Sequence, residues 1–378
     1  MISFVEYLFT TTLIWSAILA TSCSAQVASP EQLAKAGSLT SINVMNSKRA
    51  AHTATLIANE KVLITGGFVD GGGAIATAEV YEPSTMSFTA VGNMAHARAS
   101  HTATKLPNGK ILIAGGFNGE YLDSAEIYDP STNRFQPAGR MTTPRSGQIA
   151  TLLNDGTILL AGGVGTGWTF LSSAEIYDPR TNSFSKTVSM TTERESHTAN
   201  VLNDGRVLIT GGHKGRRAAI TIFNSAEIYD PVKKTFTLVG NLNTKRHKHE
   251  AILLDDGRVL VLGGSDERDG AGAYRSAEFY DPKTNTFTPI EQNMVQARYK
   301  LQGAVTKLKD GKILIAGGSD QAEVFDPATN TFSLTRGRMS SNRLFATATV
   351  LGNGQVLIAG GYHSGSNNVS DGAWIFRI

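Results

Sequence analysis

The sequence contains a single cysteine, Cys23, close to its amino terminus. One thiol can form no disulfide within the chain, and it cannot supply a zinc site built on several thiolates. The sequence also lacks a glycine-rich phosphate loop before a helix, a Gly-x-Ser-x-Gly elbow and a His-Glu-x-x-His motif. These absences leave no standard signature of a hydrolase, a metalloprotease or a nucleotide-binding enzyme.

Charge is scarce as well. Charged residues make up 18% of the chain and the formal net charge is +3, which suits a turn-rich all-β protein. Neither value calls for nucleic acid as a partner, and we expect none.

A long membrane-spanning apolar run is also missing from the amino-terminal region. Leu8 to Ala20 is too short to cross a membrane, but it has the length of the hydrophobic part of a signal peptide. Ala20-Thr-Ser-Cys23 resembles a bacterial lipoprotein processing site, which would place a lipid on Cys23, and cleavage after Ala25 is the alternative. No Lys or Arg precedes Lys35, so the usual positive start is absent. We expect residues 1–25 to be a leader that exports the protein to the periplasm, the cell surface or the exterior, with membrane contact only through a lipid on Cys23.

Glycine, by contrast, is abundant, with 39 residues, and many of them belong to a repeat. Each repeat opens with an arginine, continues through a Thr- and Ala-rich stretch and an apolar run, and then reaches two glycines. The period is roughly 43 to 54 residues, which is typical of propellers and other repeat arrays. The opening arginines are Arg49, Arg98, Arg145, Arg194, Arg246, Arg298 and Arg343.

Each repeat predicts four short strands. The second strand is apolar almost throughout, as expected of a strand covered on both faces. Asn-Gly or Asp-Gly pairs precede it in all but the first repeat and predict two-residue hairpins. A Tyr, or Phe325, lies on the third strand, and a Phe follows seven residues later on the fourth, where the two rings can pair across the sheet. The expected second strands are Val62–Thr65, Ile111–Ala114, Ile158–Ala161, Val207–Thr210, Val259–Leu262, Ile313–Ala316 and Val356–Ala359.

The last repeat ends with the chain and lacks its own outer strand. Ser38 to Met45 has the spacing of such a strand before Arg49, so we expect it to pair with the carboxyl-terminal strand and close the ring, which hides two sheet edges. The predicted fold is an all-β, seven-bladed propeller of four-stranded antiparallel blades over residues 38–378, after a spacer at 26–37. The predicted blades lie at about 46–94, 95–141, 142–190, 191–242, 243–294, 295–339 and 340–378, with the outer strand of the last blade at 38–45.

The repeat resembles the kelch family, whose hallmarks are a double glycine after an apolar strand and a Tyr followed at fixed distance by a large aromatic residue. Gly66-Gly67, Tyr81 and Phe88 show this pattern, with Phe in place of the Trp that the family often uses. The resemblance covers residues 38–378 and implies a propeller. It implies less about function, because kelch propellers include enzymes, peptide receptors and adhesion modules.

The opening arginines allow two interpretations. They enter the first strand near the central channel, where a ring of guanidinium groups would attract carboxylates or phosphates. Alternatively, each satisfies loop carbonyls or pairs with a glutamate of the third strand, and we favour this structural role because binding sites seldom need seven equivalent groups. The recurring glutamates are Glu79, Glu126, Glu175, Glu227, Glu278 and Glu323.

Four histidines follow their arginines by three residues, and a metal ring could be imagined there. They belong to different repeats and no carboxylate accompanies them at ligand spacing, so we expect framework histidines and no metal or other cofactor. They are His52, His101, His197 and His249.

One face of the propeller should carry every irregular loop, and such loops on a rigid scaffold are where binding usually occurs. Basic residues in the fourth and fifth blades could form a sector for an anionic glycan or an acidic peptide. A solvated face balanced by Asp266, Glu267 and Asp269 is the equal alternative. Exposed aromatic rings on the same loops could stack on sugars or anchor a peptide. The candidate ligand-binding residues are Tyr121, Trp168, Lys214, Arg216, Arg217, Arg246, Lys248, Tyr274 and Tyr362.

The function we expect is a monomeric, exported, non-catalytic binding module whose loop face takes a protein or carbohydrate ligand. The alternative is a periplasmic sugar-modifying enzyme resembling the kelch-type sialic-acid mutarotases. Copper radical oxidases resembling galactose oxidase need a Tyr joined to a Cys, and Cys23 lies outside the predicted propeller, so that chemistry is disfavoured.

Overall fold

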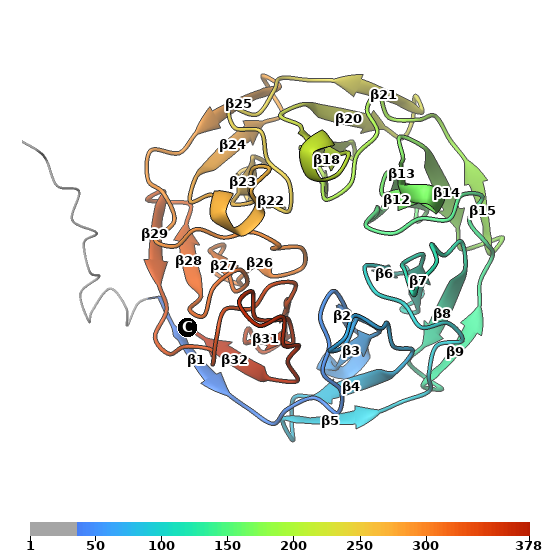
Figure 1. Ribbon diagram of the computed structural model, residues 1–378, viewed down its shortest axis with the longest axis vertical. Coiled ribbons are helices and arrows are strands. Elements are labelled where there is room, and N and C mark those ends of the chain that lie inside the picture. The colour runs from blue at the N-terminus through green and yellow to red at the C-terminus, as the bar shows by residue number, and fades with distance from the viewer. Residues whose placement is uncertain (1–35) are drawn as a thin grey trace, which may run out of the picture.

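Seven four-stranded antiparallel sheets stand around a central channel as the blades of a propeller (Figure 1). The computed structural model describes residues 36–378, so the predicted leader with Cys23 lies outside the described residues. Helix is confined to short 3-10 turns in this range. The prediction of an all-β, seven-bladed propeller is confirmed. The 3-10 turns are η1 (Ala58–Glu60), η2 (Thr166–Trp168), η3 (Arg217–Ala219) and η4 (Asp269–Gly272).

The innermost strand of each blade lines the channel. It is short and rich in Thr and Ala, and small side chains allow the inner strands of neighbouring blades to approach one another. These strands are β2 (Thr53–Leu56), β6 (Thr102–Lys105), β10 (Ile149–Leu152), β16 (Thr198–Val201), β22 (Glu250–Leu253), β26 (Val305–Lys307) and β30 (Thr347–Val350).

The second strand of each blade is the core of its sheet. Every one of its residues is buried, because the adjacent blades cover both faces. The predicted bounds agree with the structure except that the sixth strand ends one residue earlier. These strands are β3 (Val62–Thr65), β7 (Ile111–Ala114), β11 (Ile158–Ala161), β17 (Val207–Thr210), β23 (Val259–Leu262), β27 (Ile313–Ile315) and β31 (Val356–Ala359).

The third and fourth strands form the outer hairpin of each blade. Tyr81 lies directly opposite Phe88 with ring centroids 5.0 Å apart, and five other blades repeat the aromatic pair. The third strands are β4 (Ala78–Glu82), β8 (Ala125–Asp129), β14 (Ala174–Asp178), β20 (Ala226–Asp230), β24 (Ala277–Asp281), β28 (Glu323–Asp326) and β32 (Ala373–Arg377). The fourth strands are β5 (Ser87–Ala90), β9 (Arg134–Pro137), β15 (Ser183–Lys186), β21 (Thr235–Leu238), β25 (Thr286–Pro289), β29 (Thr331–Leu334) and, for the last blade, β1 (Ser38–Ser41).

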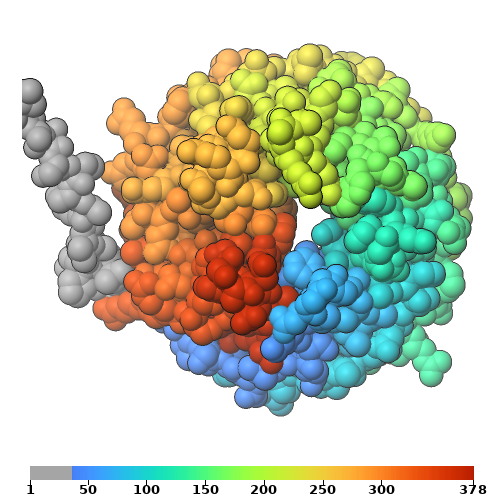
Figure 2. Space-filling model, viewed as in Figure 1, coloured from blue at the N-terminus to red at the C-terminus, as the bar shows by residue number. Residues whose placement is uncertain are grey.

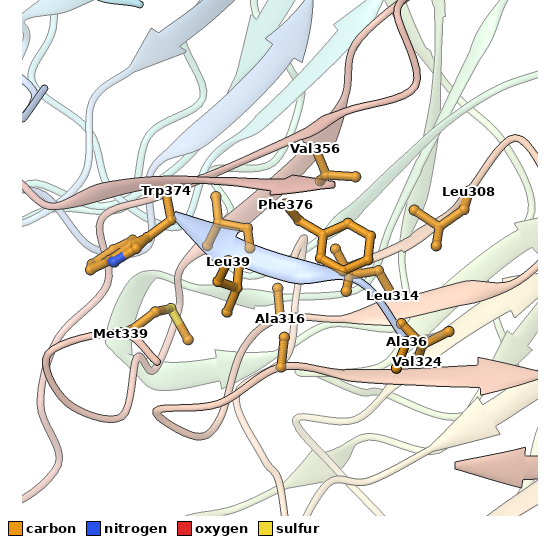
Figure 3. Packing of buried hydrophobic residues seen from close by; sticks show 12 residues of the cluster. Ala36, Leu39, Leu308, Leu314, Ala316, Val324, Met339, Val356, Trp374 and Phe376 are labelled. Atoms are coloured by element: carbon orange, nitrogen blue, oxygen red, sulfur yellow. The ribbon is translucent and has the colours of Figure 1, made fainter. Parts of the chain in front are cut away.

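The two ends of the described chain meet in the seventh blade, as predicted. Strand β1 pairs antiparallel with β32, and Leu39 lies opposite Phe376. Figure 3 shows Leu39 among Trp374 and Phe376 of the same blade and Met339 of the preceding one. Regular strand pairing ends at Ser41 rather than Met45, although Ile42 N and Met45 N still donate to the carbonyls of Ala373 and Asp371. The ring is closed because side chains from the amino-terminal strand β1 and the carboxyl-terminal strand β32 are buried against one another.

The turns before the second strands differ from the prediction. In the second blade Leu106 N donates to Lys110 O and Gly109 N donates to Leu106 O, so the loop contains three residues, not two. Only the glycine adopts positive φ, at 82°, while the Asn108 side chain accepts a bond from Lys110 N. The local side-chain bond of Asn or Asp favours this wider turn.

The long loops between the second and third strands lie on one face, here called the upper face. Two of them form small extra hairpins, β12 (Val164–Gly165) with β13 (Thr169–Phe170), and β18 (His213–Lys214) with β19 (Thr221–Ile222). Figure 2 shows an opening near the centre of the ring, beside the yellow-green loop of the fourth blade and the blue first blade. No helix within residues 36–378 is both long and apolar enough to cross a membrane.

Candidate functional site

The opening arginines lie inside the blades rather than at the channel mouth. Arg145 is fully buried, and its Nη1 donates to the carbonyls of Gly162 and Ser173. Its Nη2 lies 2.8 Å from Oε1 of Glu175. Both terminal nitrogens are therefore engaged within the blade. The equivalent ion pairs are Arg49–Glu79, Arg98–Glu126, Arg145–Glu175, Arg194–Glu227, Arg246–Glu278 and Arg298–Glu323.

Arg343, in the seventh blade, differs from the others. Its blade has Trp374 where the other third strands have a glutamate, and the guanidinium lies 5.3 Å from the centre of that ring. Its Nη2 donates to the Ser340 hydroxyl. Burial lowers the pKa of Arg343, while Asp371 partly compensates.

The residue two positions after each opening arginine forms a ring around the channel. All seven adopt left-handed backbone conformations, with φ between 49° and 66°. Backbone bonds join successive blades here, for example from Ser100 N to Ala51 O at 2.9 Å and from Lys248 N to Ser196 O at 3.0 Å. The members of this channel ring are Ala51, Ser100, Gly147, Ser196, Lys248, Lys300 and Phe345.

The fourth, fifth and sixth blades depart from the repeat around this ring. The position just before it holds Ala or Ser in the first three blades but Glu195, His247 and Tyr299 in the next three. Lys248 and Lys300 are the charged members of the ring itself. The departures gather beside His213 and Asp269 of the upper loops. We call Glu195, His213, His247, Lys248, Asp269 and Lys300 the channel-mouth site.

Lys248 and His247 share one carboxylate. Nζ of Lys248 lies 2.5 Å from Oδ1 of Asp269, and Nε2 of His247 lies 3.6 Å from the same oxygen. Burial lowers the pKa of Lys248, and the bond to Asp269 counteracts this. The side chain of Lys248 is 16% exposed and that of Asp269 is 47% exposed, so a ligand arriving from the upper face can reach the pair.

The hydrogen-bond partners set the tautomers of the two histidines. Burial lowers the pKa of His213 to about 3 and of His247 to about 4, so both are neutral at pH 7. Nε2 of His247 lies 3.2 Å from the Asp266 carbonyl and carries its proton. His247 Nδ1 therefore accepts from His213 Nδ1, 3.2 Å away. This leaves the lone pair of His213 Nε2 directed at Glu195.

The Glu195 carboxyl faces the unprotonated Nε2 of His213. Its Oε2 lies 3.6 Å from Nε2 of His213, and its side chain is 25% exposed. Burial raises the pKa of Glu195 to about 7, although Lys248 and Arg216 act in the opposite direction. Two facing acceptors favour the protonated carboxyl. Glu195 consequently titrates near neutral pH.

Lys300 lies in an aromatic surrounding. Its Nζ donates to the Tyr362 hydroxyl at 2.6 Å and lies 5.1 Å from the centre of the Tyr299 ring and 5.6 Å from that of Phe345. No carboxylate within residues 36–378 lies at ion-pair distance from it. Burial lowers the pKa of Lys300, and Asp269 opposes this shift. Lys300 thus offers a cation without a resident anion.

Two predicted aromatic residues meet on the upper face. Tyr121 and Trp168 lie edge to face with centroids 5.6 Å apart, and Phe117 packs against both. The Arg216 guanidinium covers the Trp168 ring. Trp168 is 48% exposed and has φ of 64°, a strained value for a large side chain. We call Phe117, Tyr121 and Trp168 the aromatic platform; these residues, with the loop backbone, line a pocket of about 550 Å³.

The other candidate residues are dispersed. Lys214 pairs with Glu193 at 3.0 Å, and Arg246 is buried against Glu278. Arg217 is exposed in η3, and Tyr274 lies beside Arg246 in the blade wall. Ion pairs therefore partly neutralise the basic sector of the fourth and fifth blades, and Arg216 lies next to the aromatic platform.

The framework histidines lie in the channel wall and bond to other framework groups or to none. Nε2 of His101 lies 3.1 Å from the Thr65 hydroxyl of the preceding blade. Burial lowers the pKa of His52 and of His197 to about 3. In residues 36–378 no group of three or more His, Cys, Asp or Glu side chains is arranged to hold a metal ion.

Reading the sequence motif by motif missed Glu195, Glu250 and Lys300. Each lies at a position where at least half of the other repeats have Ala, Ser or Thr. Aligning the seven repeats and marking the charged departures would have found all three. The missed signal was deviation from the repeat.

Comparison with known proteins agrees with the architecture. The kelch motif matches three consecutive stretches, residues 98–142, 148–191 and 196–243. Among solved structures, the chain is similar to a fungal alcohol oxidase of the AA5 family, in complex with copper, with a TM-score of 0.71. The identity is 16%, and the match covers 90% of this chain and 76% of that chain, so the likeness shows the fold alone. No curated protein matches the chain.

Proposed function

Because the chain is a kelch-repeat β-propeller, an architecture that serves as a binding module, we propose that its upper face binds a protein or carbohydrate ligand that carries a carboxylate. The observation that carries this proposal is the gathering of charged departures from the repeat at the channel-mouth site. Framework residues recur in most blades, whereas these occur in the fourth to sixth only.

The ligand's carboxylate would lie between Lys300 and Lys248. Lys300 has no resident anion, and the Lys248 ammonium has two further N–H groups beside its bond to Asp269. Charge-assisted hydrogen bonds from both would hold the carboxylate. The aromatic platform, with Arg216, would contact a sugar ring or an aromatic side chain of the same ligand.

We further propose that the protein acts outside the cytoplasm. The support is the apolar segment Leu8 to Ala20 with small residues after it. Detection of mature protein beginning at Cys23 with a lipid, or just after Ala25, in an envelope or culture fraction would test this. An intact amino terminus on cytoplasmic protein would contradict it.

The binding proposal is tested with acidic peptides and carboxylated oligosaccharides against their amide or neutral counterparts, at low and at physiological salt. We expect only the carboxylates to bind, and more weakly as salt rises. Lys300→Met should lower the affinity about tenfold, since one charge-assisted bond is lost. Lys233→Met removes the same charge from the turn between β20 and β21 on the opposite face and should change nothing. Equal binding of neutral counterparts, or none of carboxylates, would overturn the proposal.

Sugar modification is the second candidate function, and Glu195 favours it. A carboxyl with a pKa of about 7 beside a neutral histidine can give and take a proton near neutral pH. Following anomer exchange of sialic acid by NMR, with Glu195→Gln as the control, would test it. An exchange rate equal to that of buffer would eliminate this candidate.

A further inference from the structure

Below the channel-mouth site the channel contains a cavity of about 290 Å³. Glu195 and Glu250 both line it, together with Gln148 and Gln302. The central opening in Figure 2 indicates that the channel is accessible from the upper face. The volume suits a small polar group rather than a folded partner.

Hydrogen-bond acceptors of this wall lack donors. Gln148 is 6% exposed, and its Nε2 donates to the Ala114 carbonyl while its Oε1 has no partner among the described residues. Oε1 of Gln302 is buried and also has no partner in that part of the chain. The carboxylate of Glu195 accepts no hydrogen bond from residues 36–378, and His213 Nε2 lies 3.6 Å from it. Unpaired buried acceptors are costly, so a donor that entered would be stabilised.

Among residues 36–378, no Lys or Arg side chain lines this cavity. Burial raises the pKa of Glu250 to about 7, as it does for Glu195, although Glu250 Oε2 accepts a bond from Gly303 N at 3.0 Å. The framework histidines His52 and His197 line the same cavity, but they are neutral at pH 7. Two positive groups, Lys248 and Arg216, lie near Glu195, and both approach it from the channel mouth above the cavity.

The wall is shaped around Glu195. Gly147 occupies a channel-ring position at which Ala51 and Ser100 carry a Cβ, and a Cβ on Gly147 would lie 2.7 Å from Oε1 of Glu195. The absence of a side chain there makes room for the carboxylate against the third blade. The glutamate and the glycine are therefore matched across the channel.

We propose that this cavity binds the primary ammonium group of a small zwitterion whose carboxylate lies at the channel-mouth site. This proposal rests on the proposed function. An ammonium supplies up to three N–H donors and the positive charge that both glutamates lack. Lys248 and Arg216 at the mouth repel a lone amine, and a ligand that brings its own carboxylate offsets them. The geometry offers no set of ligands for a metal ion in residues 36–378.

The test uses isothermal titration calorimetry with three probes of equal chain length: ε-aminohexanoate, hexanoate and hexylamine. We expect ε-aminohexanoate to bind most tightly. Glu195→Gln should weaken ε-aminohexanoate and hexylamine about tenfold and leave hexanoate unchanged, since only the ammonium contact is lost. Lys300→Met should weaken ε-aminohexanoate and hexanoate and leave hexylamine unchanged.

The amine also reports on the protonation of Glu195. An ammonium pairs with the ionised carboxylate, so binding below neutral pH should release a proton. The released proton is measured from the dependence of the binding heat on buffer ionisation enthalpy, and Glu195→Gln should reduce it. A merely structural role of Glu195 would not produce this signal.

Gly147→Ala provides a second variant that keeps every charge. Ala51 holds the same ring position with φ of 49°, so the backbone accepts alanine there, but the methyl would displace the Glu195 carboxylate. We expect several-fold weaker amine binding with hexanoate unchanged, while Ala51→Gly, the reverse exchange in the first blade, should change neither. Hexanoate binding without amine binding, or amine binding insensitive to Glu195→Gln, overturns the ammonium site alone. Failure of hexanoate to bind, or its insensitivity to Lys300→Met, overturns the carboxylate site instead.

Discussion

Two adjacent positions of the repeat are used in opposite ways. The opening position is arginine in all seven blades, and in six of them the arginine is paired with a buried glutamate. The next position changes from Ala50 in the first blade to Glu195, His247 and Tyr299 in the fourth to sixth. The two positions therefore differ in the task of the side chain.

The comparison separates framework from site. A buried Arg–Glu pair repeats because every blade has the same carbonyls and the same strand to hold. A charged side chain at the channel ring serves no such repeated purpose, since Ala51 and Ser100 build the ring without charge. In a closed repeat protein, departures from the repeat are therefore better guides to binding than the repeat itself.

The largest expected effect comes from removing one of the buried Arg–Glu pairs of the framework. Arg145→Leu leaves Glu175 buried without a cation and should lower the free energy of unfolding by about 4 kcal/mol. Arg343→Leu leaves no buried carboxylate, because Trp374 replaces the glutamate, and should cost about 1 kcal/mol. Urea unfolding of both variants measures the difference. Equal losses would contradict the assigned role of the pairs.

The closing blade gives the next largest effect. Leu39→Ala removes a buried side chain from the contact between β1 and β32 and should cost about 3 kcal/mol. Leu238→Ala on β21, a residue that is 55% exposed on the matching strand of the fourth blade, is the control and should cost under about 0.5 kcal/mol. The same urea titration reports both. A Leu39 variant as stable as the parent would mean that the amino-terminal strand does not hold the ring closed.

A framework histidine makes the stability of the propeller depend on pH. Burial lowers the pKa of His197 to about 3, so the unfolded chain takes up a proton that the folded chain does not as pH falls below about 6.5. Stability is lost in that direction, by about 2 kcal/mol at pH 5 for this one residue. The third blade has Gln148 at the position of His197. The variant His197→Gln should therefore fold and should remove the loss of stability at acid pH that His197 causes. Unfolding at pH 8 and at pH 5 checks it, and an unchanged pH slope would disprove it.

The smallest expected effect on stability comes from a residue of the aromatic platform. Trp168→Gly removes an exposed ring and a strained φ, so the free energy of unfolding should change by less than about 0.5 kcal/mol. Binding of the carboxylate ligand should weaken several-fold, because the aromatic platform loses its outermost ring. Thermal unfolding and calorimetry separate the two readouts. A large loss of stability would assign Trp168 to the framework.

The fold was predictable because it depends on residues that repeat. Apolar second strands, paired glycines and the Tyr–Phe spacing recur often enough to give the strand order, and the spacing before Arg49 gave the closing strand. The turn after Leu106 was not predicted correctly, since the bond from Lys110 N to the Asn108 side chain widens it to three residues. Local side-chain bonds of this kind compete with the backbone preference of an Asn-Gly pair.

The site was only partly predictable. Trp168, Tyr121 and Arg216 were expected on the upper loops, and the structure brings them together. Lys300 could be recognised as a charged departure from the repeat, but the sequence does not show that its partner is Tyr362 of the next blade, 62 residues later. Contacts between side chains of different blades depend on the closed ring.

The sequence by itself determined the number of blades, the order of their strands and the residues that each blade buries, since these follow from a pattern written seven times. Only the tertiary structure decided which charges at the channel mouth have partners. Arg246 and Lys248 are two residues apart, yet one is buried against Glu278 and the other faces Asp269 at the channel mouth. The reason is geometric. The chain adopts a left-handed conformation at Lys248, with φ of 53°, so that Arg246 faces the blade interior and Lys248 faces the channel. Ring closure alone brings the channel-facing residues of different blades together.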